Sequence, residues 1–123
     1  MGKFQAKCIV VGAALTTILA SQASAEPMRC EITSKFACAA DGCVSNRLGV
    51  FNLIDLDLGT FSRCDQNGCD EYEAKITRSG EYLVVDVPGR GMLAKLSVNG
   101  AEYVEITTLG TAVFVSFGAC RLG

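Results

Sequence analysis

Cysteines are the residues whose type and spacing most directly suggest chemistry in this sequence. CAADGC runs from Cys38 to Cys43 and CDQNGC runs from Cys64 to Cys69, so the frame Cys-x-x-[Asp/Asn]-Gly-Cys occurs twice. Paired cysteines can hold zinc, carry out thiol–disulfide exchange or form structural disulfides. The choice among the three depends on the redox compartment and on the other ligands available.

The N-terminus predicts the compartment. Lys3 and Lys7 precede an apolar run over residues 9–20, and SQASA then ends in an Ala-x-Ala pattern at Ala25. This order is typical of a secretory signal peptide over residues 1–25, cleaved near Ala25, which leaves residues 26–123 as a single domain. The run of about 12 apolar residues is too short to span a bilayer, which takes about 20. We therefore expect a periplasmic or secreted protein without a membrane span.

Disulfides are the expected state of the six cysteines that remain after Cys8 is removed with the signal peptide. An even number of cysteines in a small exported domain indicates a disulfide framework. Zinc is disfavoured because the sequence has no histidine and the spacing is Cys-x4-Cys rather than Cys-x2-Cys. A redox motif would need Cys-x-x-Cys next to a βαβ pattern. We expect no metal, no cofactor and no free thiol.

Hairpin geometry predicts how the cysteines pair. A four-residue loop places its flanking residues opposite each other on paired strands, close enough for a disulfide. Gly42 and Gly68 end the two loops, where such turns favour a positive φ. The predicted disulfides are Cys38–Cys43, Cys64–Cys69 and, by elimination, Cys30–Cys120, which would join the first strand to the last.

Carboxylates are the remaining candidates for catalysis, because without histidine neither a Ser-His-Asp nor a Cys-His arrangement can form. Asp55 and Asp57 would point the same way from a strand, and such a pair could hydrolyse glycosides. Their alternation with Ile54, Leu56 and Leu58 is instead typical of a solvated strand face. A calcium loop would need a third ligand and a later glutamate, which are missing. We therefore expect no enzyme.

The rest of the chain reads as about eight short strands separated by turns. In the first, Cys30, Ile32 and Phe36 alternate with polar residues that include Lys35, and Asn99-Gly100 is typical of a type I′ hairpin. Such a succession predicts an all-β fold, a small antiparallel up-and-down β-barrel stapled by three disulfides. The expected strands cover residues 28–36, 50–58, 60–64, 71–78, 81–87, 92–98, 101–108 and 111–120.

Surface charge suggests candidate binding residues. Asp65, Asp70, Glu71 and Glu73 surround the second cysteine loop, and a stapled acidic hairpin could dock on a basic protein with little loss of conformational entropy. Arg90, between glycines in PGRG, would be an exposed cation on a mobile loop. The alternative is an ordinary solvated turn for the acidic hairpin and an ordinary hairpin connection for PGRG.

Net charge narrows the class of partner. Without the signal peptide, 9 of the 11 basic residues remain against 13 acidic ones, a net charge of about −4. This charge argues against nucleic acid or an anionic membrane surface as the main partner. We expect a monomer or a small homo-oligomer.

Several segments resemble a known group of proteins. FAC…DGC, SRCDQNGCDEYEA, SGEY and VSFGAC are similar to small exported, disulfide-bonded proteins of unknown function from alphaproteobacteria. In architecture alone, a stapled small barrel is similar to periplasmic inhibitors of c-type lysozyme, which present loops to a basic enzyme. Of the Ser-Gly-rich motif usual in those inhibitors, this sequence contains only Ser79-Gly80. The resemblance implies a lysozyme-like enzyme as one possible basic partner.

Three functions follow from these patterns. The first is a protein-binding or inhibitor module that acts through its stapled hairpins without catalysis. The second is a structural, envelope-associated protein without a discrete ligand. The third, a carboxylate enzyme or a small-ligand carrier, would need an open pocket, which a barrel of this length, filled by its own side chains, is not expected to have.

Overall fold

The computed structural model describes residues 26–122, so the predicted signal peptide lies outside the described residues. Ten antiparallel strands and one short 3-10 helix, η2 (Pro88–Arg90), make up this part of the chain. The strands are β1 (Met28–Ala39), β2 (Gly42–Ser45), β3 (Phe51–Asp55), β4 (Thr60–Asp65), β5 (Gly68–Glu73), β6 (Lys75–Ser79), β7 (Tyr82–Val87), β8 (Met92–Ser97), β9 (Tyr103–Leu109) and β10 (Ala112–Leu122).

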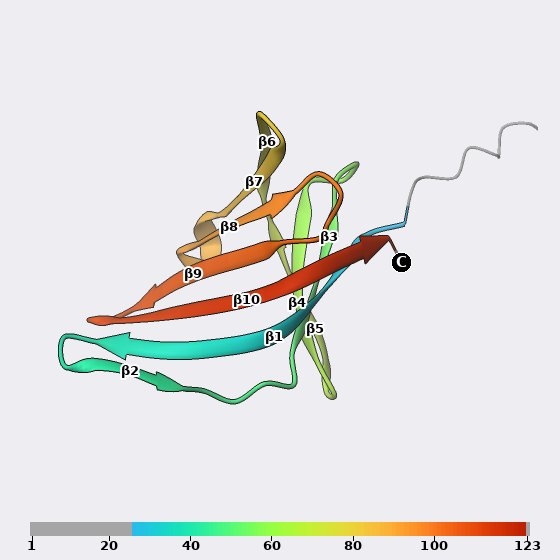
Figure 1. Cartoon of the computed structure of the whole chain (residues 1–123). Helices are drawn as coiled ribbons and strands as arrows, with labels where there is room; N and C mark the ends of the chain where they lie inside the picture. Colours follow the sequence, from blue (N-terminus) through green and yellow to red (C-terminus); the bar gives the residue numbers. More distant parts are fainter. Residues whose placement is uncertain (1–25, 123) are drawn as a thin grey trace, which may run out of the picture.

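All ten strands belong to one curved sheet. Its order is β5-β4-β3-β1-β10-β9-β8-β7-β6, with β2 paired to the far half of β1. Two meanders, β1-β3-β4-β5 and β6 to β10, are thus joined by the first and last strands, which lie side by side across the molecule in Figure 1. The sheet is a nearly closed, barrel-shaped antiparallel sheet, as the sequence predicts.

The three disulfides pair as hairpin geometry predicts. Each joins residues that are directly opposite in the strand register: Cys30 with Cys120 between β1 and β10, Cys38 with Cys43 between β1 and β2, and Cys64 with Cys69 between β4 and β5. The first links residues 90 positions apart and fixes the seam between the two meanders, whereas the others close hairpins of five positions.

Two predicted strands differ from the structure. The segment EYEAKITR is interrupted at Ala74, where the chain passes from β5 at one edge of the sheet to β6 at the other. The strand from Val50 ends at Asp55, whose Oδ1 accepts hydrogen bonds from the backbone N–H groups of Asp57 and Leu58, both at 3.0 Å. This turn removes the predicted side-by-side carboxylate pair and leaves Leu56 and Leu58 exposed.

A β-bulge in β1 overturns the predicted alternation of its side chains. Ile32 lies opposite Gly118 and Ser34 opposite Phe117, so one residue is extra on β1. Past this point the strand faces are exchanged, and Lys35 rather than Phe36 points to the barrel interior. Gly118 is needed here because a Cβ at this position would lie 1.9 Å from the carbonyl oxygen of Glu31.

The core fills the barrel interior beneath β3, β4, β7 and β8. It is apolar except for a small polar group at its end, formed by Asn52, Glu105 and Ser116. Among the described residues no helix is long and apolar enough to cross a membrane. The largest buried apolar side chains are those of Ile54, Phe61, Val85, Val87, Met92 and Leu96.

Candidate functional site

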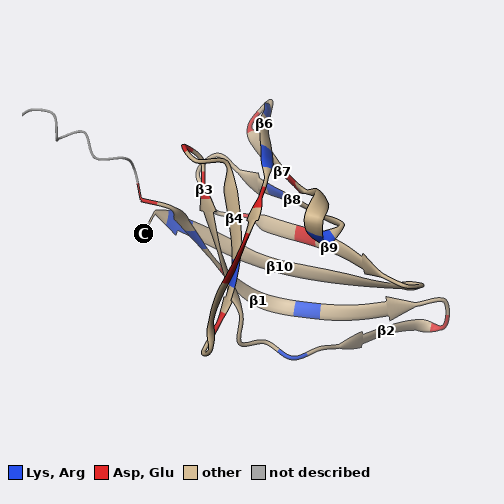
Figure 2. Cartoon of the chain, turned by 180° about the vertical axis from the view of Figure 1, so that it is seen from behind, with Lys and Arg blue, Asp and Glu red and all other residues tan. Residues whose placement is uncertain are grey.

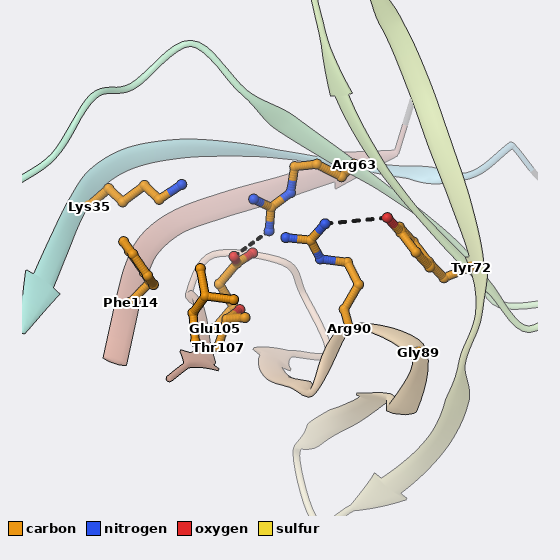
Figure 3. Close-up of a pocket in the computed structure, with 9 residues that line it drawn as sticks. Lys35, Arg63, Tyr72, Gly89, Arg90, Glu105, Thr107 and Phe114 are labelled. Atoms are coloured by element: carbon orange, nitrogen blue, oxygen red, sulfur yellow. Dashed lines mark hydrogen bonds and ion pairs between the residues drawn. The ribbon is translucent and has the colours of Figure 1, made fainter. Parts of the chain in front are cut away.

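A pocket of about 360 Å³ opens where the barrel interior meets solvent, between β4 and β5 on one side and β1, β9 and β10 on the other. Figure 3 shows Lys35, Arg63 and Arg90 reaching into this space from three different elements, with Glu105 beside Arg63. We call this pocket the barrel mouth. Its lining residues are Lys35, Arg63, Tyr72, Gly89, Arg90, Glu105, Thr107, Leu109 and Phe114.

Strand register explains why charged side chains meet inside the barrel. Lys35, Ser116 and Glu105 are direct neighbours across β1, β10 and β9, and they share the inward face because Ser116 is buried. Arg63 lies opposite buried Asn52 across β3 and β4. The bulge in β1 is therefore what brings Lys35 to the mouth.

A buried hydrogen-bond network forms the floor of the mouth. Glu105, whose side chain is 3% exposed, pairs through Oε2 with Nη2 of Arg63 at 2.5 Å. Its other oxygen, Oε1, accepts hydrogen bonds from Nδ2 of Asn52 and from the hydroxyl of Tyr103, both at 2.7 Å. Three donors thus hold one carboxylate away from water, which orients it and compensates for its desolvation.

Tyr103 acts in this network as a permanent donor. Burial, followed by the nearby negative charge of Glu105, raises the pKa of the Tyr103 phenol well above its ordinary value. The hydroxyl therefore stays protonated throughout the neutral and mildly alkaline range. It also accepts a hydrogen bond from Nδ2 of Asn52 at 2.9 Å, so donor and acceptor roles are both used.

Lys35 and Arg90 differ from Arg63 because neither forms an ion pair. The ion pairs within residues 26–122 are Arg29–Glu31, Arg121–Glu31 and Arg63–Glu105. Arg90 donates from Nη1 to the hydroxyl of Tyr72 at 3.3 Å, and its guanidinium lies 5.5 Å from the centre of that ring. Burial, followed by the positive charge of Arg63, lowers the pKa of Lys35. Both cations are thus incompletely compensated.

Two guanidinium nitrogens at the mouth have no hydrogen-bond partner. The Nε atoms of Arg63 and Arg90 are both shielded from solvent and make no bond to the described part of the protein. A buried N–H without a partner is unfavourable by about 1–3 kcal/mol, and more when the group is charged. The mouth therefore carries positive charge that its own side chains do not neutralise, although these two Nε–H groups are themselves closed to solvent.

The net charge of the residues that line the mouth is opposite in sign to the net charge of the whole chain. The lining residues include Lys35, Arg63 and Arg90 but only one carboxylate, Glu105, so their summed charge is about +2, although the chain carries −2. Converging guanidinium and ammonium groups in a partly desolvated cleft are suited to binding a carboxylate or phosphate. No group of three or more His, Cys, Asp or Glu side chains within residues 26–122 could hold a metal ion.

The residues predicted to bind a partner do not form one patch. Asp65, Asp70, Glu71 and Glu73 are all exposed on the β4–β5 hairpin, where Figure 2 shows β5 as a largely acidic strand. Asp70 lies opposite Arg63 and so faces the mouth side, whereas Glu71 and Glu73 project from the other face of β5. The hairpin is therefore acidic on both sides.

The prediction that Arg90 is exposed on a mobile loop is wrong. PGRG forms η2, Arg90 is half-buried, and its side chain packs over Tyr72. Proline fixes the start of this turn, and Gly91 ends it with a φ of 60°. The residue remains a candidate for binding, but in a pocket rather than on a loop tip.

Sequence reasoning missed four residues of the site: Asn52, Lys35, Arg63 and Glu105. In β9 the apolar alternation of Val104 and Ile106 indicates the wrong inward face, because Tyr103 and Glu105 are the buried pair. One signal was available. Asn52 shares a strand face with buried Ile54, and a polar residue on such a face requires buried partners.

Comparisons with known proteins give no relative for this chain. No protein-family model, no curated protein and no solved structure matches it significantly.

Proposed function

We propose that this chain is a non-catalytic, extracytoplasmic binding module that takes an anionic group of its ligand or partner at the barrel mouth. The observation that carries the proposal is that Lys35, Arg63 and Arg90 line one pocket with a single carboxylate, Glu105, which is ion-paired only with Arg63 among the described residues. The three disulfides are compatible with a compartment outside the cytoplasm.

A purely structural role accounts poorly for these charges. Arg63, Glu105, Asn52 and Tyr103 already form a connected network, and a barrel stabilised by it gains nothing from two more cations in the same cleft. Burial and, after it, the positive charge of Arg63 lower the pKa of Lys35, so the cleft disfavours the charged lysine in part through repulsion between like charges. An anion bound among the three cations would relieve that repulsion and form charge-assisted hydrogen bonds with them.

Calorimetric titration with sodium acetate and with inorganic phosphate tests the proposal. We expect saturable binding to the wild type at low ionic strength, at least tenfold weaker binding to Arg90→Gln and Lys35→Gln, and wild-type affinity for Lys75→Gln. Lys75→Gln is the control, because it removes the same unit of charge from an exposed position on β6 outside the mouth. Equal loss in all three variants would indicate net charge alone and contradict a site; no binding to the wild type would favour the structural, envelope-associated alternative.

A second candidate is docking of the β4–β5 hairpin on a basic protein, such as a lysozyme-like enzyme. It is favoured by four exposed acidic residues, none of which is ion-paired within residues 26–122, on a hairpin stapled by Cys64–Cys69. Salt-sensitive binding of lysozyme that is lost in Glu71→Lys/Glu73→Lys would support it. Lysozyme binding that survives this charge reversal would place the contact elsewhere.

A further inference from the structure

An apolar surface continues outward from the barrel mouth. Beyond the mouth, the ends of β1, β2, β9 and β10 extend past β3–β5, as Figure 1 shows on the left of the molecule. Val44, Ala37, Phe114 and Thr107 are neighbours across these strands. They share the inward strand face of Lys35 and Glu105, because they lie two residues along from that row. We call Ala37, Val44, Leu109 and Phe114 the apolar flange.

The apolar flange is exposed to solvent and adjoins the cationic side chains of the barrel mouth. Leu109 is 69% and Val44 67% exposed, and Leu109 and Phe114 line the same pocket as Lys35, Arg63 and Arg90. Along β1, the stretch from Lys35 at the mouth past Ala37 of the flange to Ala39 spans about 13 Å at the usual strand rise. A ligand whose charge lay at Arg63 could therefore extend along an apolar surface without leaving the protein.

We infer that the ligand of the barrel mouth is a single-chain amphiphile, a free monocarboxylate whose head lies among Lys35, Arg63 and Arg90 and whose alkyl chain lies on the apolar flange. The inference rests on the proposed function and adds the chemical class of its ligand. A small inorganic anion would leave the flange in water, and an apolar molecule without charge would leave the cations uncompensated. The pocket volume of about 360 Å³ is at the small end of the range for ligand sites, and it is suited to a ligand with a single alkyl chain.

Titration with a series of straight-chain carboxylates tests the inference. Acetate, butyrate, hexanoate and octanoate are compared by calorimetry below their micelle concentrations, at one pH and ionic strength. A fully buried methylene contributes about fourfold in affinity, and one that lies on an open surface about half of that free energy, or roughly twofold. We expect the affinity to rise about twofold for each added methylene.

Two matched variants test whether the alkyl chain of the ligand lies on the apolar flange. Leu109→Ser should reduce both the affinity for octanoate and its advantage over acetate by at least threefold. Ile106→Ser should change neither, because Ile106 lies on the same strand but on the outer face, and it is 45% exposed. Both side chains are substantially exposed, so neither substitution should prevent folding.

The outcomes separate this inference from the proposed function. Acetate binding that needs Arg90 but shows no dependence on chain length would overturn the inference and leave the anion site standing. No binding of any carboxylate would overturn both. A chain-length effect lost equally in Ile106→Ser would indicate unspecific adsorption and overturn the inference. Sedimentation that shows a dimer dissociated by Leu109→Ser would assign the flange to a second copy and would also contradict it.

Discussion

Replacing Glu105 by glutamine should change stability and anion affinity in opposite directions. Glu105 is the one carboxylate among the lining residues of the barrel mouth, and it is 3% exposed. In Glu105→Gln, the amide oxygen still accepts hydrogen bonds from Asn52 and Tyr103, so the shape of the network is retained. The ion pair with Arg63 is lost, and the mouth gains one unit of positive charge.

The stability loss follows from the burial of the pair. Breaking a buried ion pair by removing one partner typically destabilises a protein by about 3–5 kcal/mol. Arg63 is 14% exposed and the amide of Glu105→Gln would keep the hydrogen bonds from Asn52 and Tyr103, so the lower end, about 3 kcal/mol, is expected. A domain of this size, with about 5–15 kcal/mol of stability, should remain folded.

The affinity gain follows from the size of the mouth. A sphere of 360 Å³ has a radius of about 4–5 Å, and we take a separation slightly larger than this, about 6 Å, between a bound anion and the carboxylate of Glu105. Repulsion between two unit charges at that distance is about 0.7 kcal/mol in bulk water and about 2.8 kcal/mol at an effective dielectric constant of 20. An intermediate value of about 1.4 kcal/mol predicts roughly tenfold tighter acetate binding.

Urea denaturation and calorimetric titration of the same preparations measure both effects. Glu102→Gln removes the same charge from an exposed position and should change neither quantity appreciably. Addition of acetate should also restore part of the stability lost in Glu105→Gln, because the anion replaces the missing carboxylate. A folded Glu105→Gln protein with unchanged or weaker acetate binding would refute the idea that the mouth attracts anions by its uncompensated charge.

Two further predictions concern the lysine and the disulfides. Because burial lowers the pKa of Lys35 below its ordinary 10.5, acetate affinity should decline as the pH rises through that lowered pKa, and Lys35→Arg should abolish the decline in calorimetry. In the same window an unfolded Lys35 holds more protons than the folded one, so its contribution makes the unfolding free energy without ligand rise with pH, whereas the raised pKa of Tyr103 acts in the opposite direction once free tyrosine ionises. Loss of the Cys30–Cys120 disulfide, which spans 90 positions, should lower the unfolding free energy by about 4–5 kcal/mol, against about 2 kcal/mol for Cys38–Cys43, which spans five. Urea denaturation of two variants, one with both Cys30 and Cys120 replaced by alanine and one with both Cys38 and Cys43 replaced, measures this difference. Equal losses of unfolding free energy would contradict the idea that the Cys30–Cys120 disulfide contributes more by closing the longer loop.

Local signals predicted the fold well. Turn residues, cysteine spacing and period-two alternation each act over a few positions, and they indicated hairpins, disulfides and an antiparallel barrel, although alternation gave the wrong inward face in part of β1 and in β9. The type I′ turn predicted at Asn99-Gly100 is wrong, because Ser97 N–H bonds to the carbonyl of Glu102 and residues 98–101 form a four-residue loop. The two additional strands have local causes as well. One follows from the break at Ala74, and the other, β2, from four exposed residues without apolar alternation.

The site was not predictable in the same way, because it depends on register and on burial of polar groups. One extra residue in β1 reverses which side chains enter the barrel, and this reversal places Lys35 in the mouth. Arg90 looked exposed because its neighbours are glycines, whereas Tyr72, which is 18 positions away, covers it. Long-range contacts of this kind leave no periodic trace in the sequence.

The side-chain Nε–H signals of Arg63 and Arg90 in a proton–nitrogen correlation spectrum test the anion site most directly. Both groups belong to guanidiniums that line the mouth, so their signals respond to an anion bound beside them, although the Nε–H groups themselves are shielded. On titration with acetate, we predict that both signals move and saturate together, with assignments made from Arg63→Lys and Arg90→Lys. Signals that stay in place while acetate shifts only residues elsewhere would contradict an anion site at the barrel mouth.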